Sequence, residues 1–188
     1  SLGLVGSEMC IRDSSKNATT AYSAGDRVTF NDTGSRSPSV VTASVLVPGS
    51  VDVDTAFAYT LSGNASLSCS GPLSKRGEGV LNLGIVSTFT GGVSLDAGAI
   101  ALTASGSLSG GTLTMQDGTV LTNSLGANPT ANVATPIAIP SGQSATLNTG
   151  NRIVLSGALT GSGTLNTVVQ TSVSRVDMKG ATSAFTGN

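Results

Sequence analysis

The chain of 188 residues has no histidine, no tryptophan and only two cysteines, and 10% of its residues are charged. Without histidine it lacks the commonest general base and the commonest zinc ligand of proteins. Aromatic residues make up 3%, too few for binding of bases or sugars mainly by stacking on aromatic rings. The net charge of −1 gives no electrostatic reason to bind nucleic acid, and no apolar run approaches the roughly 18 residues of a membrane helix. We therefore expect no nucleic-acid partner and no cofactor.

The residues that are abundant favour short strands joined by tight turns. The chain contains 25 glycines and many serine, threonine and valine residues, whereas the charged and amide residues that favour long helices are scarce. Strand-like runs occupy 28–30, 40–47, 51–54 and 57–61, and most of them are followed by glycine, proline or asparagine. The sequence therefore predicts an all-β fold.

Short motifs recur along the chain. A leucine, a small polar turn with glycine and a second leucine occur at 66–73, 107–113 and 158–165, and a Phe-Thr-Gly motif occurs at 87–92 and 183–188. Such recurrence is typical of stacked coils, in which inward leucine and valine side chains fill a narrow core and glycines form the corners. We predict a β-solenoid over 24–188. A β-sandwich, which also uses short alternating strands, is the alternative.

The segment 71–102 reads GPLSKRGEGVLNLGIVSTFTGGVSLDAGAIAL. The positions that follow one repeat pattern without a gap are Leu73, Lys75, Gly77, Gly79, Leu81, Leu83, Phe89, Gly91, Gly92, Ala97, Gly98, Ile100 and Leu102. This pattern resembles the autotransporter-associated β-strand repeat, and the sequence departs from it at Gly84-Ile85. Residues 24–32 are similar to the strand that opens such regions, and 173–188 resembles a further copy. The resemblance implies a right-handed parallel β-helix in a large bacterial surface or secreted protein, and it implies no catalytic residue.

The first residues call for a separate interpretation. Residues 4–14, LVGSEMCIRDS, resemble the in-frame translation of a transposase adaptor used in shotgun library preparation. They lack the basic start, apolar run and cleavage site of a secretory signal. We interpret 1–14 as an adaptor artefact, 15–23 as disordered or linker, and 24–188 as a repeat region truncated at its C-terminus. Cys69 is then the one native cysteine, and we expect it to be a small packed residue.

The acidic residues are scattered, so we expect most of them to cap turns and not to form a catalytic pair. They are Asp26, Asp32, Asp52, Asp54, Glu78, Asp96, Asp117 and Asp177. Asp52 and Asp54 share one strand face and are a weak candidate for Ca²⁺ binding, because the glycine-rich repeat of calcium-binding β-rolls is absent. Ser74 and Lys75 could be a nucleophile and its base, but Lys75 stands at the basic position of the repeat. We expect Lys75 to be solvated or stacked in a ladder.

The remaining candidates also have structural interpretations. Arg152 and Arg175 would form an anion site only if they stacked on adjacent coils, and we expect surface residues paired with Asp177 or with nothing. Phe89 and Phe185 could be sugar platforms, but aromatic residues of a repeat more often pack inside the solenoid. The sequence therefore predicts no catalytic, cofactor-binding or metal-binding residue.

These features lead to one main hypothesis and one alternative. The main hypothesis is a structural or adhesive segment of a large bacterial surface-exposed or secreted repeat protein, similar to an autotransporter passenger stalk and not an enzyme. Its partner would be a host or matrix polysaccharide or protein bound through a repetitive face, and a membrane would be reached only through a missing C-terminal region. We expect an extracellular or outer-membrane location. The alternative is a fragment of a β-helical polysaccharide-active enzyme.

Overall fold

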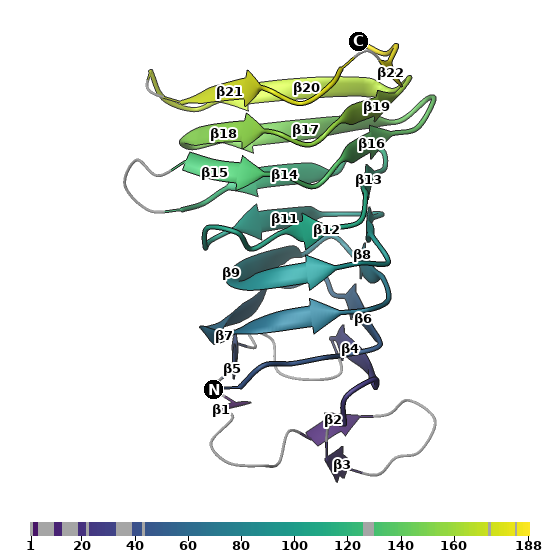
Figure 1. The fold of residues 1–188 in the computed structure, drawn as a ribbon, viewed down its shortest axis with the longest axis vertical. Coiled ribbons are helices and arrows are strands. Elements are labelled where there is room, and N and C mark those ends of the chain that lie inside the picture. Colours follow the sequence, from purple (N-terminus) through teal and green to yellow (C-terminus); the bar gives the residue numbers. More distant parts are fainter. Residues whose placement is uncertain are drawn as a thin grey trace.

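The computed structural model describes residues 2–3, 10–12, 19–21, 23–32, 39–42, 44–125, 130–172, 174–182 and 184–188. In this part of the chain every regular element is a strand and no helix occurs (Figure 1). All strand pairs are parallel except β2 (Cys10–Arg12) with β3 (Thr19–Ala21). The strands stack coil on coil in a β-solenoid, which confirms the predicted fold class and excludes the β-sandwich, whose sheets are antiparallel.

Each coil contributes a strand to as many as three faces. Face 1 is the eight-stranded parallel sheet. Its strands are β4 (Arg27–Asn31), β6 (Ser50–Asp54), β8 (Leu73–Arg76), β10 (Val93–Leu95), β13 (Leu113–Met115), β16 (Ile137–Ile139), β19 (Leu159–Gly161) and β22 (Ala184–Phe185).

Face 2 belongs to the nine-stranded sheet. The strands of this sheet are β1 (Leu2–Gly3), β5 (Ser39–Thr42), β7 (Tyr59–Cys69), β9 (Val80–Phe89), β11 (Ala99–Leu102), β12 (Ser109–Gly110), β14 (Val120–Asn123), β17 (Ser144–Thr149) and β20 (Thr164–Val169). The long strands β7 and β9 turn a corner, so that their second halves and β12 lie on face 3. In later coils face 3 is the three-stranded sheet of β15 (Thr130–Val133), β18 (Arg152–Leu155) and β21 (Arg175–Met178).

The predicted strands and segments agree with the structure to different degrees. The runs at 28–30 and 51–54 form β4 and β6, the run at 57–61 begins only at Tyr59, and the run at 40–47 contains β5 and a bridge at Leu46. β9 continues through Gly84-Ile85 without a break. Residues 4–9 and 13–18 lie outside the described residues, so the interpretations of 1–14 and 15–23 stay predictions.

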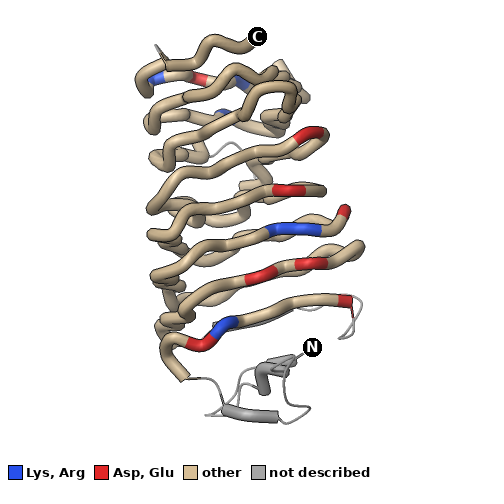
Figure 2. The backbone as a smooth tube through the Cα atoms, turned by 90° about the vertical axis from the view of Figure 1, so that its right-hand side faces the viewer, with Lys and Arg blue, Asp and Glu red and all other residues tan. Residues whose placement is uncertain are grey.

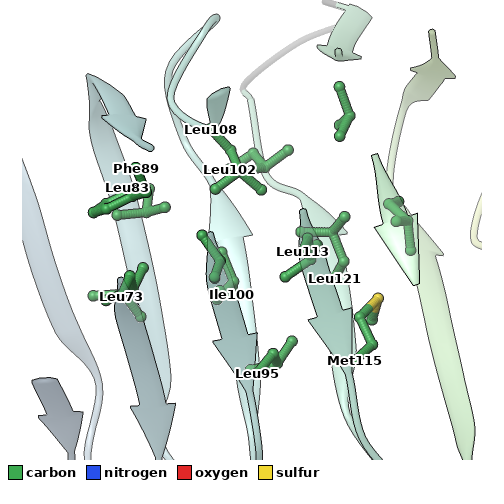
Figure 3. Packing of buried hydrophobic residues seen from close by; sticks show 14 of the residues in the cluster. Leu73, Leu83, Phe89, Leu95, Ile100, Leu102, Leu108, Leu113, Met115 and Leu121 are labelled. Carbon is green, nitrogen blue, oxygen red and sulfur yellow. The ribbon is translucent and has the colours of Figure 1, made fainter. Parts of the chain in front are cut away.

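The core is one continuous stack of inward side chains. On face 1 the same position is occupied in successive coils by Val51, Leu73, Val93, Leu113, Ile137 and Leu159, all of them buried. The step from one coil to the next is thus 20 to 24 residues, from Val93 to Leu113 and from Leu113 to Ile137. Figure 3 shows the leucines of neighbouring coils packed against one another. Strands about 4.8 Å apart bring such side chains into direct contact.

A column of glycines forms the corner between face 3 and face 1. Its members are Gly49, Gly71, Gly91 and Gly111 in four successive coils and Gly157 two coils later, with Thr135 at the same position in the coil between them. A Cβ atom on Gly71 would lie 2.1 Å from the carbonyl oxygen of Gly49, and one on Gly91 would lie 2.4 Å from the carbonyl carbon of Gly71. Where glycines stack in this way, the backbones of neighbouring coils touch and leave no room for a side chain.

The strand register shows that the copies of the sequence motifs do not all occupy equivalent places in the coil. Leu67 and Leu108 both lie on face 3, and the leucines that end their motifs, Leu73 and Leu113, both lie on face 1. The third copy is out of phase, because it begins with Leu159 on face 1. Phe89 and Phe185 likewise occupy different faces. Only the first two leucine motifs are structurally equivalent.

Substitution of Gly71 by alanine tests the glycine column. The new methyl group would collide with Gly49, so we expect Gly71→Ala to lower the free energy of unfolding by roughly 2–4 kcal/mol. Gly118→Ala is the matched control, because its Cβ would meet nothing within 4 Å and only its φ of +70° is strained, at a cost of about 1–2 kcal/mol. Urea unfolding followed by circular dichroism measures both. Equal losses would contradict a steric role for the column.

Candidate functional site

Outward side chains on the first strands of face 1 form a network of ion pairs. Asp52 accepts from Arg27 at 2.7 Å and from Arg76 at 3.1 Å, and Arg76 lies 4.0 Å from Asp54. The side chain of Asp52 is only 10% exposed, whereas those of both arginines are about half exposed or more. Asp52 and Asp54 do share a strand face, as the sequence indicated. Arginines engage both carboxylates, which disfavours the Ca²⁺ site, and no cluster of three metal-ligating side chains occurs in the described residues.

Lys75 points into the core between apolar side chains, so the expectation that it is solvated or stacked in a ladder is wrong. Its side chain is fully buried and stands in register between Val53 and Leu95. Ser74, next to it on the strand, faces outward, because neighbouring side chains of a strand alternate. The two side chains therefore cannot act together as nucleophile and base.

The buried ammonium group of Lys75 is held by backbone oxygens at the corner between face 1 and face 2. Its Nζ donates to the carbonyl oxygens of Arg76 at 2.8 Å, Gly77 at 2.6 Å and Ala97 at 3.3 Å. Ala97 belongs to the next coil, so the side chain joins two coils. Burial lowers the pKa of Lys75 below its usual 10.5, and nearby carboxylates, of which Glu78 has the largest effect, oppose this shift. The geometry supports a structural role for Lys75.

Several carboxylates cap turns, as the sequence predicts. Asp26 accepts from the backbone N–H of Ser23 at 2.8 Å, and Asp117 accepts from that of Ser144 at 3.0 Å. Asp32 accepts from the hydroxyl of Thr55 and from the backbone N–H of Ala56 at 2.9 Å. The hydrogen bond from Thr55 is the main reason why the pKa of Asp32 lies below its usual 3.8. The bonds of Asp32 and Asp117 connect residues of successive coils, whereas that of Asp26 lies within one turn.

A second ion-pair group lies on face 3 in the last coils. Arg152 and Arg175 stack in register, and both contact Asp177, with a distance of 2.6 Å from Arg152 Nε to the carboxylate. The hydrogen bond from Arg152 is the first cause of a lowered pKa of Asp177. The expected pairing with Asp177 is confirmed. Because the carboxylate engages both guanidinium groups, the pair is a poor anion site.

Cys69 and Phe89 are packed in the core, as predicted. Cys69 is a free, buried cysteine, and burial raises the pKa of its thiol above 9.0, which disfavours the reactive thiolate. Phe89 is fully buried. Phe185 is partly buried and packs against the same core. Neither aromatic ring of this pair is a flat, open platform.

The charged residues are distributed unevenly over the faces. None of the strands of the nine-stranded sheet contains Asp, Glu, Lys or Arg. Its outward side chains hydrogen-bond from coil to coil, for example Asn82 to Thr60 at 3.2 Å and Asn166 to Ser144 at 2.9 Å. Figure 2 shows that charged positions in the middle coils lie toward one side of the solenoid. The molecule thus has an uncharged amide- and hydroxyl-bearing face beside a charged corner.

A shallow hollow of about 340 Å³ lies on the outer surface where the glycine column meets β10 and β13. Its lining residues are Pro72, Thr90, Gly91, Gly92, Val93, Ser94, Gly111, Thr112 and Thr114. None of these residues is titratable. Sequence reasoning did not find the hollow, because residues of three coils form it.

Comparison of the chain with protein-family models, with curated proteins and with solved structures gave no match. The resemblance of 71–102 to the autotransporter-associated repeat therefore stays a prediction. No helix in the described residues has the length and apolar character that a membrane span requires.

Replacement of Lys75 by methionine tests the effect of the buried ammonium group. Because the folded state lowers the pKa of Lys75, the unfolded chain binds more protons between that lowered pKa and 10.5. The contribution of Lys75 to stability should therefore rise with pH in this window. We expect the free energy of unfolding of the wild type, measured relative to Lys75→Met by urea titration, to increase toward pH 10.5. Raised pKa values of Cys69 and Tyr59 act in both proteins and cancel in the difference. A difference in unfolding free energy that does not change with pH would contradict a lowered pKa of Lys75.

Removal of the Thr55 hydroxyl tests the cap of Asp32. In Thr55→Val the carboxylate loses its main stabilising donor, so its pKa should move upward toward 3.8. The stability that Asp32 contributes is present above pH 3.8 and disappears as the pH falls through the lowered pKa, and this contribution should shrink in the variant. NMR titration of the Asp32 carboxyl carbon measures the pKa. Thr122→Val, on face 2, should leave it unchanged, and an equal shift in both variants would contradict the cap.

Proposed function

We propose that this chain is a structural stalk segment of a large bacterial surface-exposed or secreted repeat protein, of the kind found in autotransporter passengers. The observation that carries the proposal is the continuous core stack on face 1, from Val51 to Leu159, through coils that repeat every 20 to 24 residues. Such a stack extends along one axis and adds length with each coil, which suits a spacer.

The placement of the titratable groups supports a stalk over the alternative of a polysaccharide-active enzyme. An enzyme of that class needs free carboxyl groups that converge on one bond. Here Asp52 and Asp177 each engage two arginines, and Lys75 is buried against backbone oxygens. Because these groups already have structural partners, catalysis would require them to leave those partners, whereas a stalk that holds or presents a partner requires no such rearrangement.

The uncharged face supports the proposed mode of partner binding. Outward amides and hydroxyls of the nine-stranded sheet repeat at the coil spacing of about 4.8 Å and include no charged strand residue. A repetitive neutral face suits weak, multivalent contact with a polysaccharide or protein of a host or matrix. On this proposal the protein acts outside the cell or at the outer-membrane surface.

Single-molecule pulling tests the stalk proposal. With handles at the two ends of the chain, we expect coils to detach one after another, because each coil contacts mainly its neighbours. Each step should release roughly 70–85 Å of chain, the extended length of one coil of 20 to 24 residues.

The Gly71→Ala variant provides the internal control for this measurement. It weakens one corner, so the step that involves its coil should occur at lower force while the others keep theirs. Unfolding of the whole chain in one event, at forces no higher than those that stretch an unfolded chain, would contradict a stalk that withstands tension.

A further inference from the structure

The hollow on the corner beside face 1 exists because side chains are missing there in two neighbouring coils. Gly91 and Gly92 follow one another in one coil, and Gly111 lies in the next. A Cβ atom on Gly92, whose φ is +87°, would lie 3.0 Å from the carbonyl oxygen of Thr112, and one on Gly111 would lie 2.7 Å from the nitrogen of Gly92. Coil stacking thus fixes these glycines, and the floor of the hollow is backbone.

The residues that correspond to Gly92 in the coils on either side carry side chains and form the walls. They are Pro72 and Thr112, which precede the core residues Leu73 and Leu113 as Gly92 precedes Val93. Both wall residues are exposed. Pro72 offers an apolar ring surface, and Thr112 offers a hydroxyl opposite it. The hollow is therefore polar and apolar at once, as small-ligand sites usually are.

Hydroxyl groups supply the hydrogen-bonding capacity. Thr90 donates to the carbonyl oxygen of Ser70 at 2.8 Å, and Ser94 donates to Asp96, so both oxygens keep lone pairs as acceptors. The hydroxyls of Thr112 and Thr114 make no hydrogen bond to any of the residues described, so each can donate and accept. A ligand with many hydroxyl groups matches this lining, because it can replace its hydrogen bonds to water by hydrogen bonds to the hydroxyl groups of the hollow.

We propose that the hollow binds a neutral hexose unit of a polysaccharide. Its volume of about 340 Å³ is at the lower end of small-molecule sites, which suits one sugar ring of a chain that continues into solvent on both sides. The absence of a titratable lining residue favours a neutral sugar over a uronic acid or a sulfated one. The proposal rests on the proposed function in one respect, the polysaccharide partner. It adds one defined contact, at the corner beside face 1, to the weak and repetitive contacts proposed for the uncharged sheet.

A glycan array tests the ligand class. The array carries neutral glucans, galactans and mannans together with polygalacturonate and alginate. We expect the protein to bind at least one neutral class and to prefer it to both anionic polymers. Binding to no neutral glycan, or preference for an anionic one, would overturn the proposal.

Titration calorimetry with a hexasaccharide of the bound class then tests the location. Each hydroxyl removed should weaken binding about fivefold, so Thr112→Val/Thr114→Val should raise Kd by about 25-fold. Valine has nearly the shape of threonine and favours extended backbone, so the fold should be kept at Thr114 in β13 and at Thr112 just before it, and unfolding midpoints verify this. Thr122→Val on face 2 is the control and should change Kd less than twofold. A Kd unchanged in the double variant would overturn the hollow as the site while leaving the stalk proposal, which the pulling experiment tests independently.

Discussion

Direct contact between the backbones of successive coils at one corner is the constraint on which the rest of the structure depends. Where Gly71 meets Gly49, a single methyl group would separate the coils. The close approach lets the inward side chains of face 1 stack without gaps, from Val51 through Leu73 to Val93. It also removes side chains from the outer surface of the corner, which creates the hollow between Pro72 and Thr112. The close packing of the coils and the proposed sugar-binding hollow thus have the same steric origin, the glycines at this corner.

The second organising feature is the way in which charge is confined. A buried ammonium group is costly unless hydrogen bonds replace its hydration. Lys75 meets this requirement with carbonyl oxygens of its own coil and of Ala97 in the next coil. The arginines of the first and last coils pair with carboxylates, around Asp52 and around Asp177. The nine-stranded sheet is left uncharged, and this separation supports the proposed role in holding and presenting over a role in catalysis.

The parts of the fold that could be predicted were those that local alternation and turn chemistry control. The runs at 28–30 and 51–54 became strands, and Asp26, Asp32 and Asp117 cap turns. The phase of the repeats could not be read in the same way. The motif at 158–165 resembles those at 66–73 and 107–113 in letters, but it lies on a different corner, because the lengths of the intervening turns decide where each leucine falls.

By itself the sequence determined that the molecule is all-β: many short strands, glycine-rich turns and recurring motifs favoured a solenoid, and the parallel pairing in the structure then excluded the sandwich. Only the tertiary structure decided what each side chain meets. Alternation along β8 requires Ser74 and Lys75 to face opposite ways, but it does not state which of them faces the core. That choice depends on Val53 and Leu95, the partners of Lys75 in the coils on either side. Coil closure brings together residues 20 to 24 positions apart, and this is a property of packing and turn length that no local pattern contains.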